Sequence, residues 1–346
     1  MNPYVRAIIT SGLILGPIIT MSSNHWITAW CGLEMNSLTM IPLIANKYQP
    51  RAIEASTKYF LTQAMASYLM LSAALMNMWY YGQWDMQLLT DNISCTTMTV
   101  AMSIKLAAAP FHFWFPEVLQ GATVLTALLL TTWQKLAPLT ILVQCSQNLD
   151  TTLLIALGMT SILIGGWGGL NQTQIRKIMA FSSIAHLGWM YAILTLSPKI
   201  LLLTFYLYVA MTATTFLMIN VLQTNNMSAI MISWTKTPFM NTMMLLNLMS
   251  LAGLPPLTGF APKWLILQEF TKQRLSMFAS MMITSSLLSL YFYLRMSYYT
   301  IITLPPTTCN YPLQWRLMTN IHTALATITP LATALMPLLP TLKAIP

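Results

Sequence analysis

Three charged residues lie inside long apolar stretches of the sequence, at Glu34, Lys105 and Lys135, and Lys263 lies just beyond a fourth such stretch. A charge at the centre of a bilayer costs about 2.5–3.5 kcal/mol on insertion scales, so these residues are unfavourable as mere filler. Buried lysines and carboxylates of this kind mark proton relays. The alternative is a structural ion pair, or a lysine whose ammonium group extends to the membrane surface.

The backbone around Lys105 carries a second signal, because Pro110 and Pro116 follow it in SIKLAAAPFHFWFPEV. Pro110 has no N–H and its ring clashes with the carbonyl four residues earlier, so Leu106 loses its helical partner. Freed backbone groups in a membrane are tolerated only where protein or water satisfies them. The break therefore predicts a hydrated cavity. His112 lies within it, and the unperturbed histidine pKa of about 6.5 suits proton passage.

The same arrangement recurs in SLAGLPPLTGFAPKW, where Pro256 and Pro262 precede Lys263. The interval along the chain from Pro110 to Pro256 equals that from Pro116 to Pro262, and we call it the repeat interval. The first five apolar runs, shifted by the repeat interval, fall close to the next five.

We therefore expect one membrane domain over 1–346, built from five-helix repeats at 1–145 and 146–297 and a loop with a C-terminal helix at 298–346. A unit with an odd number of spans, repeated in tandem, is inserted upside down the second time, as in many transporters. The sequence thus predicts inverted repeats, each with a proline-broken helix.

The composition agrees with a membrane protein. Of 346 residues only 16 are Lys or Arg and 7 are Asp or Glu, or 7% charged, while 56% are hydrophobic. A soluble domain carries about 25% charged residues. We predict an all-α polytopic protein with about eleven spans. They lie near 3–21, 26–45, 59–80, 96–116, 122–144, 151–170, 178–196, 200–222, 238–258, 275–297 and 321–340.

The remaining charges predict the orientation. The side that holds the N-terminus carries nine basic residues against Glu54 and Glu117, a net +7, and the other side sums to zero. The nine are Arg6, Lys47, Arg51, Lys58, Arg176, Lys177, Lys236, Arg295 and Arg316. The zero comes from Lys199, Lys272, Arg274 and Lys343 against Asp85, Asp91, Asp150 and Glu269. Basic residues collect on the cytoplasmic side or its equivalent, so the N-terminus should lie there.

Several functions are disfavoured by the same residues. The basic residues form no run that suggests nucleic-acid binding. The four cysteines, Cys31, Cys95, Cys145 and Cys309, show no metal-binding spacing, so we expect no metal site. The glycine-rich GGWGG at 165–169 ends an apolar run, where close helix packing is the better interpretation. A soluble enzyme is excluded, since no nucleophile–base arrangement is present.

Five segments resemble the antiporter-like membrane subunits of mitochondrial NADH–ubiquinone oxidoreductase, respiratory complex I, in their vertebrate form. They are WCGLEMNSL, SIKLAAAPFHFWFPEVLQG, LLTTWQKLAP, GLNQTQIRKIMAFSSIAHLGWM and LAGLPPLTGFAPKW. The resemblance runs essentially from end to end. It implies that Glu34 pairs with the broken-helix Lys105, that Lys135 bridges onward, and that Lys263 belongs to the second broken helix. His112 and His186 would lie along the hydrated axis.

The resemblance also implies the setting. This chain would hold no flavin, iron–sulfur cluster or ubiquinone, which belong to other subunits. Its partners would be other complex I subunits, especially neighbouring antiporter-like ones, and membrane phospholipids. It would lie in the mitochondrial inner membrane, with the N-terminus in the matrix and the C-terminus in the intermembrane space.

We therefore expect a core membrane subunit that couples electron transfer elsewhere in the complex to proton translocation through a Glu/Lys/His relay. Two alternatives remain at this point. One is a stand-alone cation/proton antiporter, which shares inverted repeats and broken helices. The other is a structural spacer, against which the buried lysines argue, because leucine would be more stable in their places.

Overall fold

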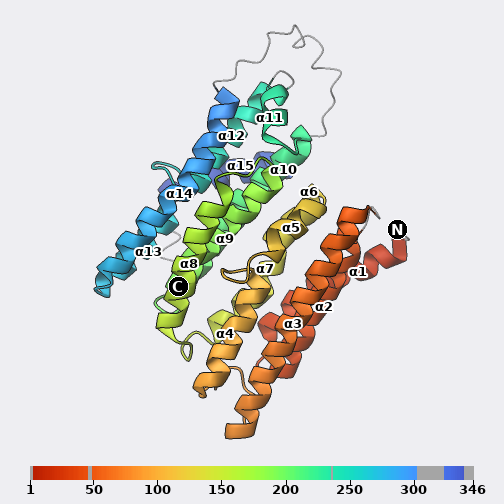
Figure 1. Cartoon of the computed structure of the whole chain (residues 1–346), viewed down its shortest axis with the longest axis vertical. Coiled ribbons are helices and arrows are strands. Elements are labelled where there is room, and N and C mark those ends of the chain that lie inside the picture. The colour runs from red at the N-terminus through yellow and green to blue at the C-terminus, as the bar shows by residue number, and fades with distance from the viewer. Residues whose placement is uncertain (1–2, 46–48, 235–236, 302–322, 339–346) are drawn as a thin grey trace. The chain divides into compact units, whose positions relative to one another are not determined.

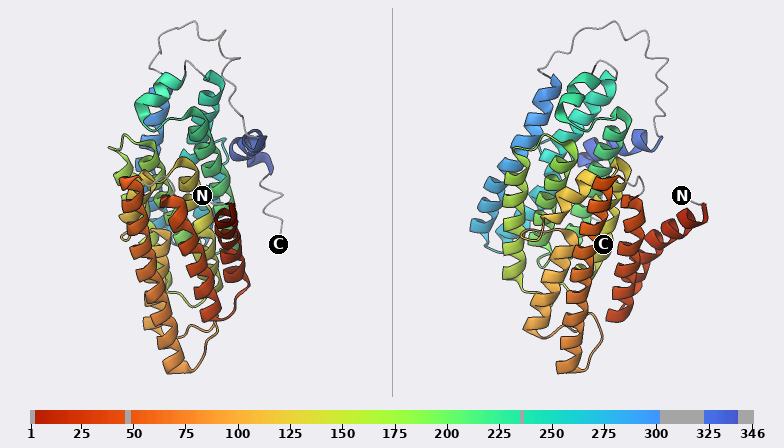
Figure 2. Two further views of the ribbon diagram at one scale, coloured as in Figure 1. Left: turned by 90° about the vertical axis from the view of Figure 1, so that its right-hand side faces the viewer. Right: turned by 45° about the vertical axis from the view of Figure 1, so that its right-hand side comes forward.

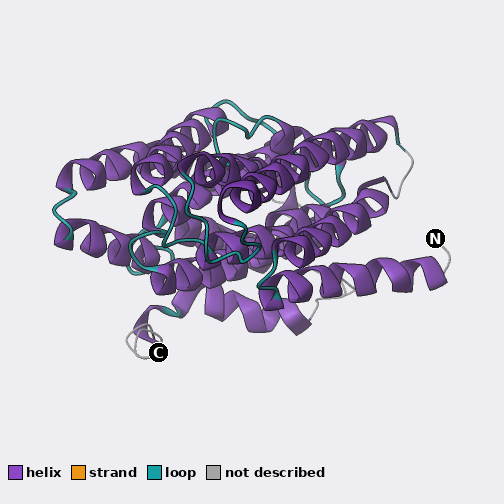
Figure 3. Cartoon of the chain, turned by 90° about the horizontal axis from the view of Figure 1, so that it is seen from below, coloured by secondary structure: helices purple, strands orange, loops and turns teal. Residues whose placement is uncertain are grey.

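The structure, a computed structural model of the chain, describes residues 3–45, 49–234, 237–301 and 323–338. Over these residues the chain is helical and contains no β-strand (Figure 3). The helices are α1 Pro3–Ser22, α2 Trp26–Ile44, α3 Pro50–Tyr81, α4 Asn92–Leu106, α5 Trp114–Gly121, α6 Val124–Thr131, α7 Trp133–Gln144, α8 Thr151–Gly169, α9 Ile175–Ile193, α10 Pro198–Leu222, α11 Met227–Ser233, α12 Pro238–Ala252, α13 Phe260–Lys272, α14 Ser276–Ile301 and α15 Thr323–Ala334. A short 3₁₀ helix follows at Met336–Leu338.

Two compact units make up the chain. Unit 1 comprises residues 1–161 and 190–198, and unit 2 comprises residues 162–189 and 199–346. In unit 1, α3 packs against both α2 and α4 (Figures 1 and 2). In unit 2, α12 packs against α14 and α15.

Among the described residues, six stretches of helix are long and apolar enough to cross a membrane: α1, α3, the α6–α7 run over 124–144, α8, α10 and α14. The prediction of an all-α multi-pass protein is confirmed at this level. The other five predicted spans fall on shorter or more polar helices: α2, α4 with α5, α9, α12 and α15. Lys47, Lys236, Cys309, Arg316 and Lys343 lie outside the described residues.

The predicted break after Lys105 is present. Helix α4 ends at Leu106 and α5 begins only at Trp114, and the Leu106 carbonyl is the one that Pro110 deprives of a partner. The end of α4 is closed by Ala107 in the left-handed region, at φ 60°. The N–H of Ala108 then donates to the Ser103 carbonyl at 2.9 Å, which satisfies one of the last carbonyls of the helix.

A second break has the same form in unit 2. Helix α12 ends at Ala252, Gly253 takes the left-handed cap at φ 83°, and α13 begins at Phe260. Both bounds of α12 follow those of α4 by the repeat interval, and the start of α13 follows that of α5 by the same interval. The spacing predicted from the prolines is thus reproduced in the bounds of the broken helices.

Two features differ from the expectation. The predicted span at 122–144 is interrupted at Thr132, which separates α6 from α7 shortly before Lys135. Helix α11 forms at Met227–Ser233, inside the expected connection at 223–237. The first difference is not explained directly by a proline, because Pro138 lies within α7 and opposes the carbonyl of Gln134, which follows Thr132. The second is a helix too short for apolar periodicity to reveal.

Glycines allow two pairs of helices to approach closely. A Cβ on Gly32 of α2 would lie 2.9 Å from the carbonyl oxygen of Gly16 in α1. A Cβ on Gly165 of α8 would lie 2.7 Å from the backbone nitrogen of Ala185 in α9. The second contact confirms the packing role expected for the glycine-rich segment at 165–169, because only glycine leaves room for the neighbouring backbone.

We predict that Gly32→Ala separates α1 from α2 and costs about 1–3 kcal/mol of stability, the usual cost of overpacking. The measurement is the thermal unfolding midpoint of the detergent-solubilised protein. The control is Cys31→Ala, at the exposed neighbouring position, which should leave the midpoint unchanged. Equal midpoints for both variants would contradict the close approach.

Candidate functional site

Unit 1 contains an ion pair between a buried lysine and a partly exposed glutamate. Nζ of Lys105, in the last turn of α4, lies 3.9 Å from Oε1 of Glu34 in α2. The Lys105 side chain is 2% exposed and that of Glu34 is 21% exposed. The Ser37 hydroxyl, one turn along α2, donates to the other carboxylate oxygen of Glu34 at 3.4 Å. The pair is therefore present as expected, at the outer limit of ion-pair distance.

Lys135 is buried nearby, in the first turn of α7, with 3% of its surface exposed. Its Nζ lies 5.4 Å from the ring centroid of Phe115 in α5. A cation at this distance over an aromatic face is attracted by the ring quadrupole, and the more so when water is excluded. Two features therefore position this lysine. The interruption at Thr132 puts it in the first turn of α7, and α5 supplies the ring of Phe115 against which it lies.

A small cavity joins the two lysines. Its volume is about 20 Å³. Its polar lining comes from both lysines and from Asn36, Ser37, Tyr59, Gln63 and Gln134. One water molecule needs about 10–15 Å³ and two to four polar partners, so the cavity has room for a water between Lys105 and Lys135.

An amide network lies beside this cavity, and sequence reasoning missed it. Nε2 of Gln134 donates to Oδ1 of Asn36 at 3.0 Å and to its backbone carbonyl at 3.2 Å. The Tyr59 hydroxyl donates to Oε1 of Gln134 at 3.5 Å. Asn36 is two residues from Glu34, and Gln134 directly precedes Lys135. The available signal was therefore a second polar residue beside each buried charge.

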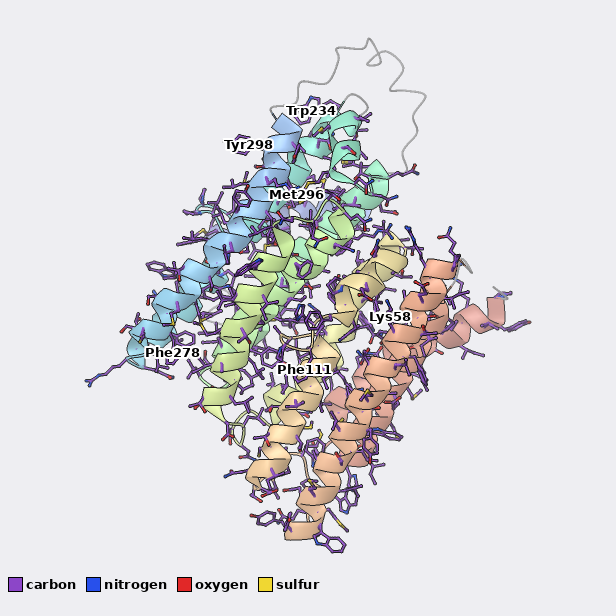
Figure 4. The ribbon with its side chains drawn as sticks, in the orientation of Figure 1. Lys58, Phe111, Trp234, Phe278, Met296 and Tyr298 are labelled. Carbon is purple, nitrogen blue, oxygen red and sulfur yellow. The ribbon has the colours of Figure 1, made fainter. Side chains whose placement is uncertain are left out.

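His112 lies where the sequence predicted, in the non-helical segment between α4 and α5. It is buried, and its Nδ1 lies 3.2 Å from the Pro110 carbonyl oxygen. Figure 4 labels its neighbour Phe111 in this segment and Lys58 on α3. Lys58 is paired with Glu117 of α5 in an exposed ion pair, outside the buried cluster.

Unit 2 contains the other two predicted residues. Nζ of Lys263, in the first turn of α13, donates to the Ala252 carbonyl at the end of α12, at 2.8 Å. It also lies 6.0 Å from the ring of Trp189 in α9. His186, one turn before Trp189, lies against Tyr208 of α10, with 5.5 Å between ring centroids.

The structure therefore places Lys105 and Lys135 around one cavity in unit 1. Glu34 is paired with Lys105, and His112 lies in the adjoining break. Within the described part of the chain, no group of three His, Cys, Asp or Glu residues could hold a metal ion. The chemistry that this arrangement supports is proton binding and release by buried side chains.

Comparisons with known proteins give the family. Residues 23–289 match the model of the NADH:quinone oxidoreductase/Mrp antiporter membrane family. Residues 290–343 match that of the NADH dehydrogenase subunit 2 C-terminus.

Individual relatives agree. The chain is 54% identical to NADH-ubiquinone oxidoreductase chain 2 of Gallus gallus over 340 residues, 98% of each chain. It is 53% identical to the same chain of Struthio camelus, over 99% of each. Its fold is similar to a chain of respiratory complex I from Thermus thermophilus, with a TM-score of 0.86 and 25% identity, covering 99% of this chain and 81% of that one. The expected vertebrate-type resemblance is confirmed.

We predict that Gln134→Leu leaves the buried Asn36 side chain unpaired and costs about 1–3 kcal/mol of stability. The thermal unfolding midpoint of the solubilised protein measures this loss. Gln144→Leu is the matched control on the same helix, because the amide nitrogen of Gln144 makes an exposed bond to the Met21 carbonyl. If both variants shift the midpoint equally, the buried network contributes no more to stability than an exposed hydrogen bond does.

Proposed function

We propose that this chain, which belongs to the family of NADH-ubiquinone oxidoreductase chain 2, moves protons through a relay of Glu34, Lys105, Lys135 and Lys263. The chain is an antiporter-like membrane subunit of respiratory complex I and takes part in its proton translocation. The oxidoreduction chemistry, with flavin, iron–sulfur clusters and ubiquinone, is assigned in this proposal to other subunits.

The observation that carries the relay is the Glu34–Lys105 pair, which adjoins a cavity shared with Lys135. A carboxylate close to a lysine favours the ammonium form, and its withdrawal favours proton release. Two unit charges 4 Å apart attract by about 4 kcal/mol at an effective dielectric of 20, and by half as much at twice the distance.

The size of this switch suits the task. A movement of Glu34 that doubles its distance from Lys105 changes the interaction by about 2 kcal/mol. Moving one charge across 100 mV costs about 2.3 kcal/mol. The two quantities are comparable, so displacement of one carboxylate can release one proton from Lys105 toward the cavity and Lys135. Several such sites in series are needed for a larger potential.

The onward path in this proposal leads to Lys263, with His112 and His186 as further carriers. Support comes from their positions: His112 lies in the first break, and Lys263 contacts the end of the second broken helix. Broken helices expose backbone groups that water satisfies, which is the setting in which a proton moves between side chains.

We further propose eleven membrane helices in two inverted five-helix repeats, 1–145 and 146–297, with a closing helix in 298–346. The support is the repeat interval, which relates both bounds of α4 to those of α12. The caps of the two breaks also correspond, with Ala107 at the first and Gly253 at the second.

The proposed setting is the mitochondrial inner membrane, with the N-terminus in the matrix and the C-terminus in the intermembrane space. The net charge of +7 on one predicted face against zero on the other supports this orientation. Neighbouring antiporter-like subunits and phospholipids are the proposed partners of the exposed apolar side chains, such as Trp79, Trp167 and Phe239.

We predict that Lys105→Met in the assembled complex lowers coupled NADH oxidation and proton uptake into vesicles by about tenfold, equal to about 1.4 kcal/mol of barrier. The reason is that methionine fills the space but carries no proton. The measurements are the rates of coupled NADH oxidation and of proton uptake in proteoliposomes, with Lys58→Met, at the exposed pair, as the control. Normal rates of both in an assembled Lys105→Met complex would contradict the relay.

We predict that Glu34→Gln slows coupled turnover while electron transfer to an artificial acceptor stays normal, because the glutamine cannot hold a charge opposite Lys105. Both rates are measured on the same membranes. Glu54→Gln, at an exposed position of α3, should change neither rate. Loss of the artificial-acceptor rate in the Glu34 variant would instead indicate failed assembly.

A further inference from the structure

Lys263 donates a hydrogen bond to the end of a helix. Its side chain starts from the first turn of α13 and folds back, so that Nζ donates to the carbonyl of Ala252, the last residue of α12. The last carbonyls of a helix lack intrahelical partners and carry the negative end of the helix dipole, equivalent to about half an elementary charge. This carbonyl end is a suitable partner for an ammonium group.

The residue that separates α12 from the folded lysine is Gly253. A Cβ at this position would lie 2.9 Å from Nζ of Lys263 and 3.1 Å from both its Cδ and Cε. Real Cβ atoms essentially never approach within 3.0 Å, so the Nζ end of this flexible side chain would have to shift, and Cδ and Cε would have to give by a few tenths of an ångström. The lysine therefore passes directly over the place where a Cβ would be.

Backbone conformation alone does not account for a glycine at 253. Gly253 is in the left-handed region at φ 83°, which favours glycine. However, Ala107 takes the corresponding cap at the end of α4, one repeat interval earlier, at φ 60°. The fold thus accepts a methyl group at one such cap. The difference is that Lys105 precedes its break, whereas Lys263 follows its break and returns across the cap.

We propose that Gly253 is a positioning residue for the proton relay: its missing side chain leaves the path by which Lys263 reaches the carbonyl end of α12. The consequence for proton movement rests on the function proposed above. The position of Lys263 does not, because the hydrogen bond to Ala252 gives it independently.

The experiment compares Gly253→Ala with Gly82→Ala in the whole complex. Gly82 is the matched control, since it caps α3 at φ 70° and a Cβ there would meet nothing within 4 Å. Both variants therefore gain a methyl group in left-handed backbone, and only one gains it against the lysine. The readouts are a high-resolution map of each complex and the ratio of coupled NADH oxidation to NADH oxidation with an artificial acceptor.

In Gly253→Ala, we expect Nζ of Lys263 to leave the Ala252 carbonyl, beyond the limit of about 3.5 Å for a hydrogen bond. The ratio of rates should fall by about tenfold, equal to about 1.4 kcal/mol. Gly82→Ala should match the unmodified complex in both readouts. A lysine that keeps its contact with Ala252 in the Gly253 variant would overturn the proposal.

A second variant covers the case in which Gly253→Ala does not assemble. If the added methyl group crowds Lys263, then Lys263→Ala in the same chain should restore the amount of complex. If the double variant is equally poor, backbone strain explains the loss and the positioning role is wrong. A displaced lysine with a normal ratio of rates would leave the position of Lys263 explained and refute its part in the relay, which separates the two proposals.

Discussion

Every feature of the site depends on one constraint: a charge or a free backbone group placed in lipid must find a partner inside the protein. Pro110 and Pro256 lie just beyond the ends of α4 and α12, where backbone carbonyls lose their helical partners, and lysines lie beside both of these ends. Because an unpartnered charge in lipid is costly, the protonation of each lysine depends on the groups that lie next to it. The same penalty explains why an apolar side chain such as Trp79 is exposed on the surface while the charged Lys105 is enclosed, the reverse of a soluble protein.

The two units answer this constraint with different partners. In unit 1, Lys105 precedes the break and meets the Glu34 carboxylate of another helix, at 3.9 Å. In unit 2, Lys263 follows the break and meets the carbonyl end of the helix before it, at 2.8 Å. A carboxylate on a separate helix can move away from its lysine, whereas a helix end attached by a short connection cannot. The first pair is therefore suited to switching and the second to holding.

The sequence predicted the end of α4 but missed the interruption at Thr132 and the contact between Gln134 and Asn36. Pro110 removes the partner of the Leu106 carbonyl, so the end of α4 follows from covalent structure. The interruption at Thr132 has no such local cause. The Gln134 side chain is one polar group among many, and only its contact with Asn36, far away in the sequence, gives it a role.

The sequence by itself determined the membrane environment, the broken helices, the interval between them and the choice of buried charges. All of these follow from local chemistry: the cost of a charge in lipid, the missing N–H of proline and the length of an apolar run. The resemblance implied the pairing of Glu34 with Lys105, but only the tertiary structure decided its distance, because helix packing brings the two side chains together. The tertiary structure alone decided that Lys263 meets the Ala252 carbonyl. It also decided that Lys263 turns back over Gly253, since a side chain's direction depends on the space that its neighbours leave.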